Sequence, residues 1–107
     1  MPSYRLTKDA ETDLLSIWRY TRGKWSETQA DLYLDELDAF CDKISSDEIV
    51  TARALADIHA NLYYSHHNHH YVFWLSVAGS KPIVVAFLHD RMDFVRHLSK
   101  RLKSSVD

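Results

Sequence analysis

The chain has little of three residue types that often constrain a fold or build a site: its 107 residues include two glycines, two prolines and one cysteine. The single Cys41 excludes an internal disulfide framework, and a reducing cytoplasm is the expected compartment. Cys41 also falls on the apolar face of a predicted helix, where a small buried residue is expected. Two glycines are too few for a glycine-rich loop of the kind that cradles phosphate groups.

A strong charge bias and a long apolar run are also missing. Thirteen Lys and Arg against fifteen Asp and Glu give a formal net charge of -2, so bulk charge does not favour nucleic-acid binding. No apolar run approaches the ~18 residues that a membrane span needs, and the N-terminus lacks a signal-peptide pattern. The 46% of hydrophobic residues is ample for the core of one domain spanning 1–107.

The first half of the chain has the apolar spacing of two amphipathic helices. Thr7 is expected to cap a helix over about 8–22, with Gly23 as its C-terminal stop. Ser26 and Gln29 match the capping box that opens a second helix, whose outer face is acidic. The connection is so short that the two helices must form an antiparallel hairpin.

The second half has the pattern of strands. Residues 62–64 and 71–77 are dense in aromatic and β-branched residues, and Asn68 is the natural turn centre between them. The continuous apolar run 83–88 is typical of a central strand covered on both faces. Short turns between these runs predict an antiparallel meander. The segment 45–58 stays open between a short helix and an irregular crossing.

Two short segments complete the predicted fold. Tyr4 to Thr7 alternate as one strand, and Phe94 to about Lys103 repeat at helical spacing with a basic side. We therefore expect an α+β fold: an N-terminal strand, an antiparallel helical hairpin packed on a small, mainly antiparallel sheet with a three-stranded C-terminal meander, and a basic C-terminal helix. The pattern does not decide whether that last helix docks or projects.

Two polar clusters are candidates for chemistry. The His-rich run 66–70 has the donor type for Zn or Ni, but no Cys or carboxylate is interleaved, so a solvated turn is favoured and no metal or cofactor is expected. His89, Asp90, Arg91 and Asp93 follow the central strand and would suit an acid-base set. In the simpler interpretation one of the aspartates caps the last helix.

The order and spacing of these segments resemble the ParE/RelE superfamily of toxins, and the ParE type in particular. Three stretches carry the resemblance: YRLTKDAETDLLSIWRYTRGKWSETQADLYLDELDAF, the His-x-Val-Phe-Trp strand from His70 to Trp74, and LHDRMDFVRHL. The fold that this implies agrees with the one expected from periodicity. The stretch 45–60 departs from the family pattern, because it lacks the common Pro-x-x-Gly turn.

The resemblance implies the toxin half of a bacterial type II toxin-antitoxin pair, with a role in plasmid or chromosome stabilisation. It implies inhibition of DNA gyrase by binding, and neutralisation by a small cognate antitoxin, expected to be of the ribbon-helix-helix type. Exposed aromatics such as Trp18 and Trp25 are expected to contact the antitoxin. The expected target-binding residues form a cationic patch without catalytic residues: His89, Arg91, Arg96 and Lys100. Neither sequence-specific nucleic-acid binding nor membrane association is expected.

Two alternative functions remain open. Toxins of the RelE branch are ribosome-dependent mRNA interferases; here His89 would be the general acid or base and Arg91 would hold the scissile phosphate. Cations are scarce in the middle of the chain, however, and the last tyrosine is Tyr71. The other alternative is a non-toxic module that still binds an antitoxin.

Overall fold

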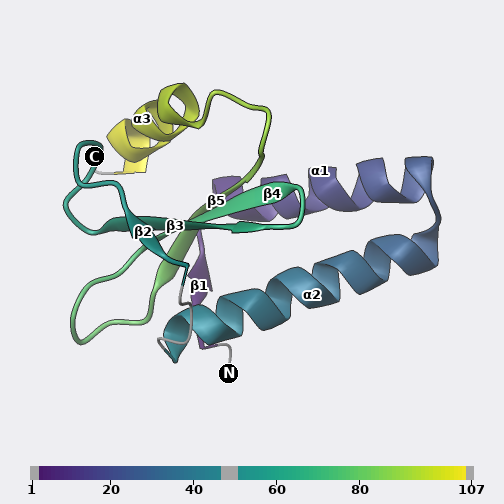
Figure 1. Ribbon diagram of the computed structural model, residues 1–107, viewed down its shortest axis with the longest axis horizontal. Coiled ribbons are helices and arrows are strands. Elements are labelled where there is room, and N and C mark those ends of the chain that lie inside the picture. The colour runs from purple at the N-terminus through teal and green to yellow at the C-terminus, as the bar shows by residue number, and fades with distance from the viewer. Residues whose placement is uncertain (1–2, 47–50, 106–107) are drawn as a thin grey trace.

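The computed structural model describes residues 3–46 and 51–105, with side chains described as far as Leu102. The elements are β1 (Arg5–Leu6), α1 (Lys8–Lys24), α2 (Glu27–Ser45), β2 (Arg53–Ala54), β3 (Leu62–His67), β4 (His70–Leu75), β5 (Ile83–His89) and α3 (Phe94–Ser105) (Figure 1). The strands form one sheet in the order β1-β5-β4-β3-β2. β1 is parallel to β5 and the other pairs are antiparallel. The predicted α+β fold is therefore confirmed.

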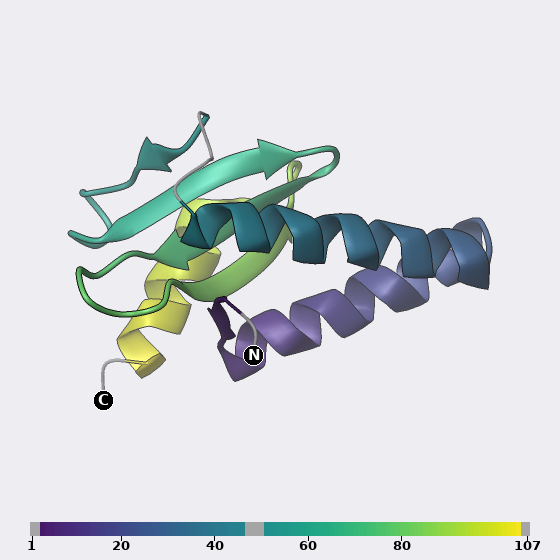
Figure 2. The ribbon, with the colours of Figure 1, turned by 90° about the horizontal axis from the view of Figure 1, so that it is seen from below.

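The sheet lies between two hydrophobic cores. On one face the helical hairpin buries Ile17 and Leu37 in a core shared with Trp74 of β4. On the other face α3 buries Leu98 and Leu102, so the C-terminal helix docks on the sheet (Figures 1 and 2). β5 is covered on both faces, as predicted, and all its residues from 84 to 88 are buried.

The two predicted N-caps are confirmed. The Thr7 hydroxyl accepts a hydrogen bond from the Ala10 backbone N–H at 3.1 Å, and the Ser26 hydroxyl accepts one from the Gln29 N–H at 3.0 Å. Each cap satisfies a helix N-terminal donor and contributes about 1 kcal/mol. None of the described helices is both long and apolar enough to cross a membrane.

The prediction that Gly23 ends the first helix is wrong. α1 continues to Lys24, because the backbone N–H of Trp25 still donates to the Thr21 carbonyl at 2.9 Å. Only one residue then separates Trp25 from the start of α2 at Glu27. The hairpin therefore turns around Trp25, and its closed end extends well past the sheet (Figure 1).

The turns of the sheet follow the sequence in one place and depart from it in another. Asn68 is the turn centre between β3 and β4 and has a φ of 54°, a left-handed conformation that asparagine tolerates. The segment 45–58 was expected to be a short helix or an irregular crossing, whereas β2 adds a strand to the meander by pairing Arg53 with Tyr64. Residues 47–50 of that segment lie outside the described part of the chain.

Along part of its edge β5 has no neighbouring strand among the described residues, and two charged side chains bind its backbone there instead. We call this pair, Asp13 and Arg101, the polar node. β1 pairs only as far as Leu6, beside Val84. Further along, the Asp13 carboxylate accepts the Phe87 backbone N–H at 3.0 Å, and the Arg101 guanidinium donates to the Val85 carbonyl at 3.1 Å. Asp13 and Arg101 also pair with each other through two contacts of 2.6 and 2.8 Å. The node joins α1, β5 and α3.

Candidate functional site: a pocket between the helical hairpin and the sheet

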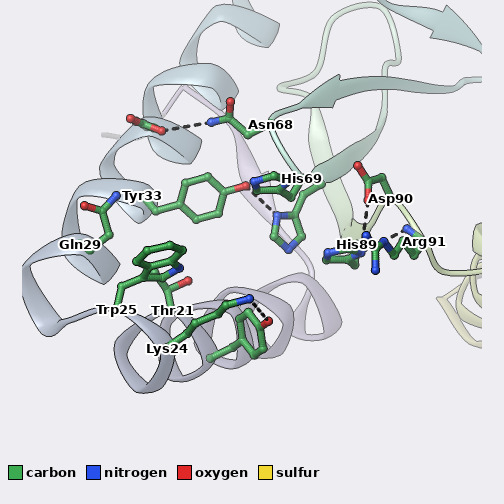
Figure 3. A pocket seen from close by; sticks show the side chains of 13 residues that line it. Thr21, Lys24, Trp25, Gln29, Tyr33, Asn68, His69, His89, Asp90 and Arg91 are labelled. Carbon is green, nitrogen blue, oxygen red and sulfur yellow. Dashed lines mark hydrogen bonds and ion pairs between the residues drawn. The ribbon is translucent and has the colours of Figure 1, made fainter.

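An open pocket of about 590 Å³ lies where the closed end of the hairpin meets the β3–β4 turn and the loop after β5 (Figure 3). Three segments that are distant in the sequence build it: the closed end of the hairpin over residues 20–36, residues 68–70 and residues 89–91. Its lining residues are Tyr20, Thr21, Lys24, Trp25, Gln29, Tyr33, Glu36, Asn68, His69, His70, His89, Asp90 and Arg91.

The hairpin contributes exposed aromatic rings and a cation. Trp25 is 69% exposed and Tyr20 is 64% exposed. The Lys24 ammonium lies 3.4 Å from the Tyr20 hydroxyl and 5.8 Å from the centre of its ring, within cation-π range. This wall therefore presents a positive charge flanked by two large, exposed rings.

His70 and Tyr33 form a hydrogen-bonded pair inside the pocket. The Tyr33 hydroxyl lies 2.7 Å from Nδ1 of His70. Burial, reinforced by the neighbouring His89, lowers the pKa of His70 to about 4, so the ring is neutral near pH 7. Burial raises the pKa of Tyr33 to about 12, so its hydroxyl stays protonated within this hydrogen bond. His70 is therefore not a base poised near neutral pH.

The opposite wall is the charged run after β5. The His89 Nδ1 atom accepts the Arg91 backbone N–H at 3.2 Å and lies 3.3 Å from an Asp90 oxygen. The other Asp90 oxygen lies 3.1 Å from Nε2 of His66. Desolvation alone would raise the pKa of Asp90, but the hydrogen bond with His66 and the charge of His89 lower it. Two imidazoles thus hold the Asp90 carboxylate in its ionised form.

Two cations of the pocket stand apart from its carboxylates. Within residues 3–46 and 51–105, no carboxylate oxygen lies within ion-pair distance of the Lys24 ammonium or the Arg91 guanidinium. Asp90 faces histidines, and the Glu36 carboxylate lies 3.4 Å from Asn68 Nδ2. Lys24 and Arg91 therefore supply the positive charges that a ligand can use.

The structure brings three of the predicted site residues together. His89, Arg91 and Trp25 line the pocket. The other two members of the predicted cationic patch, Arg96 and Lys100, are exposed on α3, one helical turn apart. The loop after β5 thus connects the pocket to the basic side of α3.

Trp18 lies elsewhere on the hairpin. Its indole N–H donates to Asp31 of α2 at 2.9 Å, and the Arg22 guanidinium sits 4.8 Å from the centre of the ring. These contacts give Trp18 a role in holding the two helices together, in contrast to the exposed Trp25.

The remaining polar residues divide between structural roles. Asp93 caps α3 by accepting the Arg96 backbone N–H at 3.5 Å, as one of the sequence interpretations predicted. The His-rich turn spreads its rings toward different partners, including Asp90 and Tyr33. Among the residues that the structure describes, no three His, Cys, Asp or Glu side chains are arranged to hold a metal ion.

The pocket was not predicted from the sequence. From the sequence, Tyr20 and Tyr33 are ordinary residues of amphipathic helices, and Lys24 belongs to the connection between them. His70 was assigned to a solvated turn, although it faces Tyr33 and has a depressed pKa. The one available signal was Lys24-Trp25, a cation and a large aromatic in a connection too short to bury them.

Comparison with known proteins agrees with the architecture. Residues 4–94 match the family described as "ParE toxin of type II toxin-antitoxin system, parDE". Toxin ParE of Escherichia coli is 38% identical over 103 residues, which cover 96% of this chain and 99% of that protein. The matched region includes the hairpin, the sheet and every residue that lines the pocket. The chain therefore belongs to the ParE toxin family of type II toxin-antitoxin systems.

Proposed function

We propose that this ParE-family toxin inhibits DNA gyrase by binding, and that a small cognate antitoxin, expected to be of the ribbon-helix-helix type, neutralises it. The observation that carries the proposal is the family match over residues 4–94, which spans the helical hairpin and the charged loop after β5. The E. coli relative, a Toxin ParE, aligns with almost the whole chain.

The state of two groups in the pocket, His70 and Asp90, favours binding over acid-base catalysis. General acid-base catalysis near pH 7 needs a group with a pKa close to that value. His70 is neutral and hydrogen-bonded to Tyr33, and the Asp90 carboxylate lies against His66 and His89. The cationic patch of His89, Arg91, Arg96 and Lys100 is the surface that we assign to the target.

Exposed aromatic surface supports masking by an antitoxin. A contiguous patch of exposed apolar side chains marks an interaction surface, and Trp25 and Tyr20 lie together in the wall of the pocket. Trp25 at the closed end of the hairpin is 69% exposed, so we assign it to the antitoxin contact. Trp18 joins that contact only through its exposed edge, because Asp31 and Arg22 already hold its ring.

The direct test is supercoiling by purified gyrase in the presence of the full-length toxin. Inhibition together with accumulation of cleaved DNA supports the proposal, and the cognate antitoxin added first should prevent both effects. Unchanged supercoiling with no cleaved DNA would rule out gyrase as the target.

One observation favours a second candidate, the ribosome-dependent mRNA interferase. The pocket collects His89, Arg91 and Lys24, so cations that are scattered in the sequence meet in one place. In that function His89 would move a proton and Arg91 would hold the scissile phosphate. Toeprinting of mRNA on translating ribosomes separates the two functions, because only a nuclease produces cuts at defined codon positions.

The remaining alternative is a non-toxic module that still binds an antitoxin. Expression of the protein without its antitoxin tests it, because such a module would not arrest growth.

A further inference from the structure

The pocket has a chemical character that binding to a protein target does not require. It combines exposed ring faces, cations without carboxylate partners, and side-chain amides within one concavity. Its volume of about 590 Å³ is in the range of small-molecule sites, which run from about 300 to 1,000 Å³.

We propose that this pocket binds one nucleotide unit of a single-stranded nucleic acid. The Trp25 ring offers a stacking face for a base, and Lys24 and Arg91 offer positive charge to the flanking phosphates. Sites that bind single strands without sequence preference combine these two features, aromatic platforms and cations along the backbone path. The proposal goes beyond gyrase inhibition and does not depend on it.

The polar groups of the pocket suit the edge of a base. Gln29 and Asn68 each carry both donors and an acceptor, so they can pair with any base edge. Glu36 accepts from amino groups, and its carboxylate is already directed to the Asn68 side of the pocket. Its negative charge therefore lies where a base binds and not where we place the phosphates.

The cations come from opposite walls of the pocket. Lys24 belongs to the end of α1, and Arg91 belongs to the loop after β5, with Trp25 and Tyr33 on the hairpin side (Figure 3). A ligand that reaches both needs anionic groups on each side of a flat central part. A nucleotide within a strand offers these groups, since a phosphate stands on each side of the sugar that carries the base.

The topology argues against an extended peptide as the occupant. β4 is an inner strand of the sheet, and beyond Val84 the edge of β5 is covered by the Asp13 and Arg101 side chains, which already take the Phe87 N–H and the Val85 carbonyl. β2 pairs only with Tyr63 and Tyr64, so the outer edge of β3 over residues 65–67 has no strand partner in the described part of the chain. These residues do not line the pocket, so strand addition, the usual mode for extended peptides, would not fill it.

The test is titration of the full-length protein with a short, fluorescently labelled single-stranded oligothymidylate at low salt. We expect Lys24→Gln and Arg91→Gln each to weaken binding several-fold. Each should also reduce the steepness of the plot of log K against log salt concentration by about 0.7, because one phosphate contact is lost. Trp25→Ala should weaken binding about tenfold, and Trp25→Phe should restore most of the loss, because stacking needs a ring and not an indole.

Lys8→Gln is the matched control, since it removes one exposed cation at the opposite end of α1. It should leave affinity unchanged. Equal losses in Lys8→Gln and Arg91→Gln would show general surface attraction and overturn the proposal. Failure of the oligonucleotide to bind, or saturable binding of an acidic peptide at Lys24 and Arg91 in its place, would also overturn it. The gyrase assay is separate, so this failure would leave the proposed target standing.

Discussion

Among individual side chains, His70 shows how burial sets chemistry. The ring lies beside His89, at 5.4 Å between centroids, and its Nδ1 atom is hydrogen-bonded to the Tyr33 hydroxyl. Burial disfavours the protonated ring, and protonation would place a positive charge next to His89. The folded protein therefore holds the pKa of His70 at about 4, below the ordinary value of 6.5.

This depressed pKa predicts a loss of stability in acid. Between pH 6.5 and about 4 the unfolded chain binds a proton at His70 that the folded chain does not, so the free energy of unfolding falls as the pH falls through that window. We expect His70 to contribute about 1–2 kcal/mol, a figure that allows for its partial exposure. Urea denaturation at several pH values measures the effect.

The control for the acid effect is the neighbouring exposed histidine. His70→Gln should reduce the pH dependence of stability below pH 6.5, and it should do so by more than His69→Gln does. An equal slope in His70→Gln and the parent protein would mean that His70 is not the titrating group.

The two tryptophans of the hairpin predict opposite phenotypes. Trp25→Ala removes a ring that is 69% exposed, so stability should change by less than about 0.5 kcal/mol while antitoxin binding weakens at least tenfold. Trp18→Ala removes the contacts to Asp31 and Arg22 and should lower stability by about 1 kcal/mol or more. Thermal melts and titration calorimetry with the antitoxin measure both. Tight antitoxin binding by Trp25→Ala would place the antitoxin elsewhere.

Among secondary structure elements, α3 depends most on a single polar node. The side chains of Asp13 and Arg101 are only 13% and 20% exposed, and each also satisfies a backbone group of β5. Removing one partner leaves the other charge, and a backbone group of β5, without a hydrogen-bond partner at a nearly buried position. The pair therefore fixes α3, and with it Arg96 and Lys100, against the sheet.

We accordingly predict that Asp13→Asn and Arg101→Gln each lower the free energy of unfolding by about 2–4 kcal/mol. Hydrogen exchange in α3 should accelerate more than exchange in α2. Arg96→Gln is the matched control, because it removes a cation from the exposed face of the same helix and should cost less than about 0.5 kcal/mol. Similar losses for Arg96→Gln and Arg101→Gln would contradict the role of the node.

The elements also show which parts of a fold a sequence can reveal. The caps at Thr7 and Ser26, the Asn68 turn and the buried strand β5 were predictable, because each depends on neighbouring residues or on a strong period. β2 was not, because a strand of two exposed residues has no period to detect and forms only by pairing with β3. The extension of α1 past Gly23 depends on a single backbone hydrogen bond.

For the protein as a whole, the arrangement of the hairpin against the sheet creates the pocket. His89 and Arg91 could be selected from the sequence because a buried strand delivers them to the surface. Their neighbours Lys24 and Tyr33 come from other elements, and only the packing of the hairpin brings them close. A pocket built from three separate segments leaves no local pattern in the chain.

The placement of the functional surface on the loop after β5 and on α3 is tested most directly by the double variant Arg91→Glu with Arg96→Glu. Both side chains are exposed, so the fold should persist while the sign of the patch reverses. We predict that expression of this variant no longer arrests growth and that the purified variant still binds its antitoxin. Arg5→Glu with Lys8→Glu, which reverses two exposed cations in β1 and at the start of α1, should remain toxic. Growth arrest by the Arg91 and Arg96 double variant at the parent level would contradict this placement.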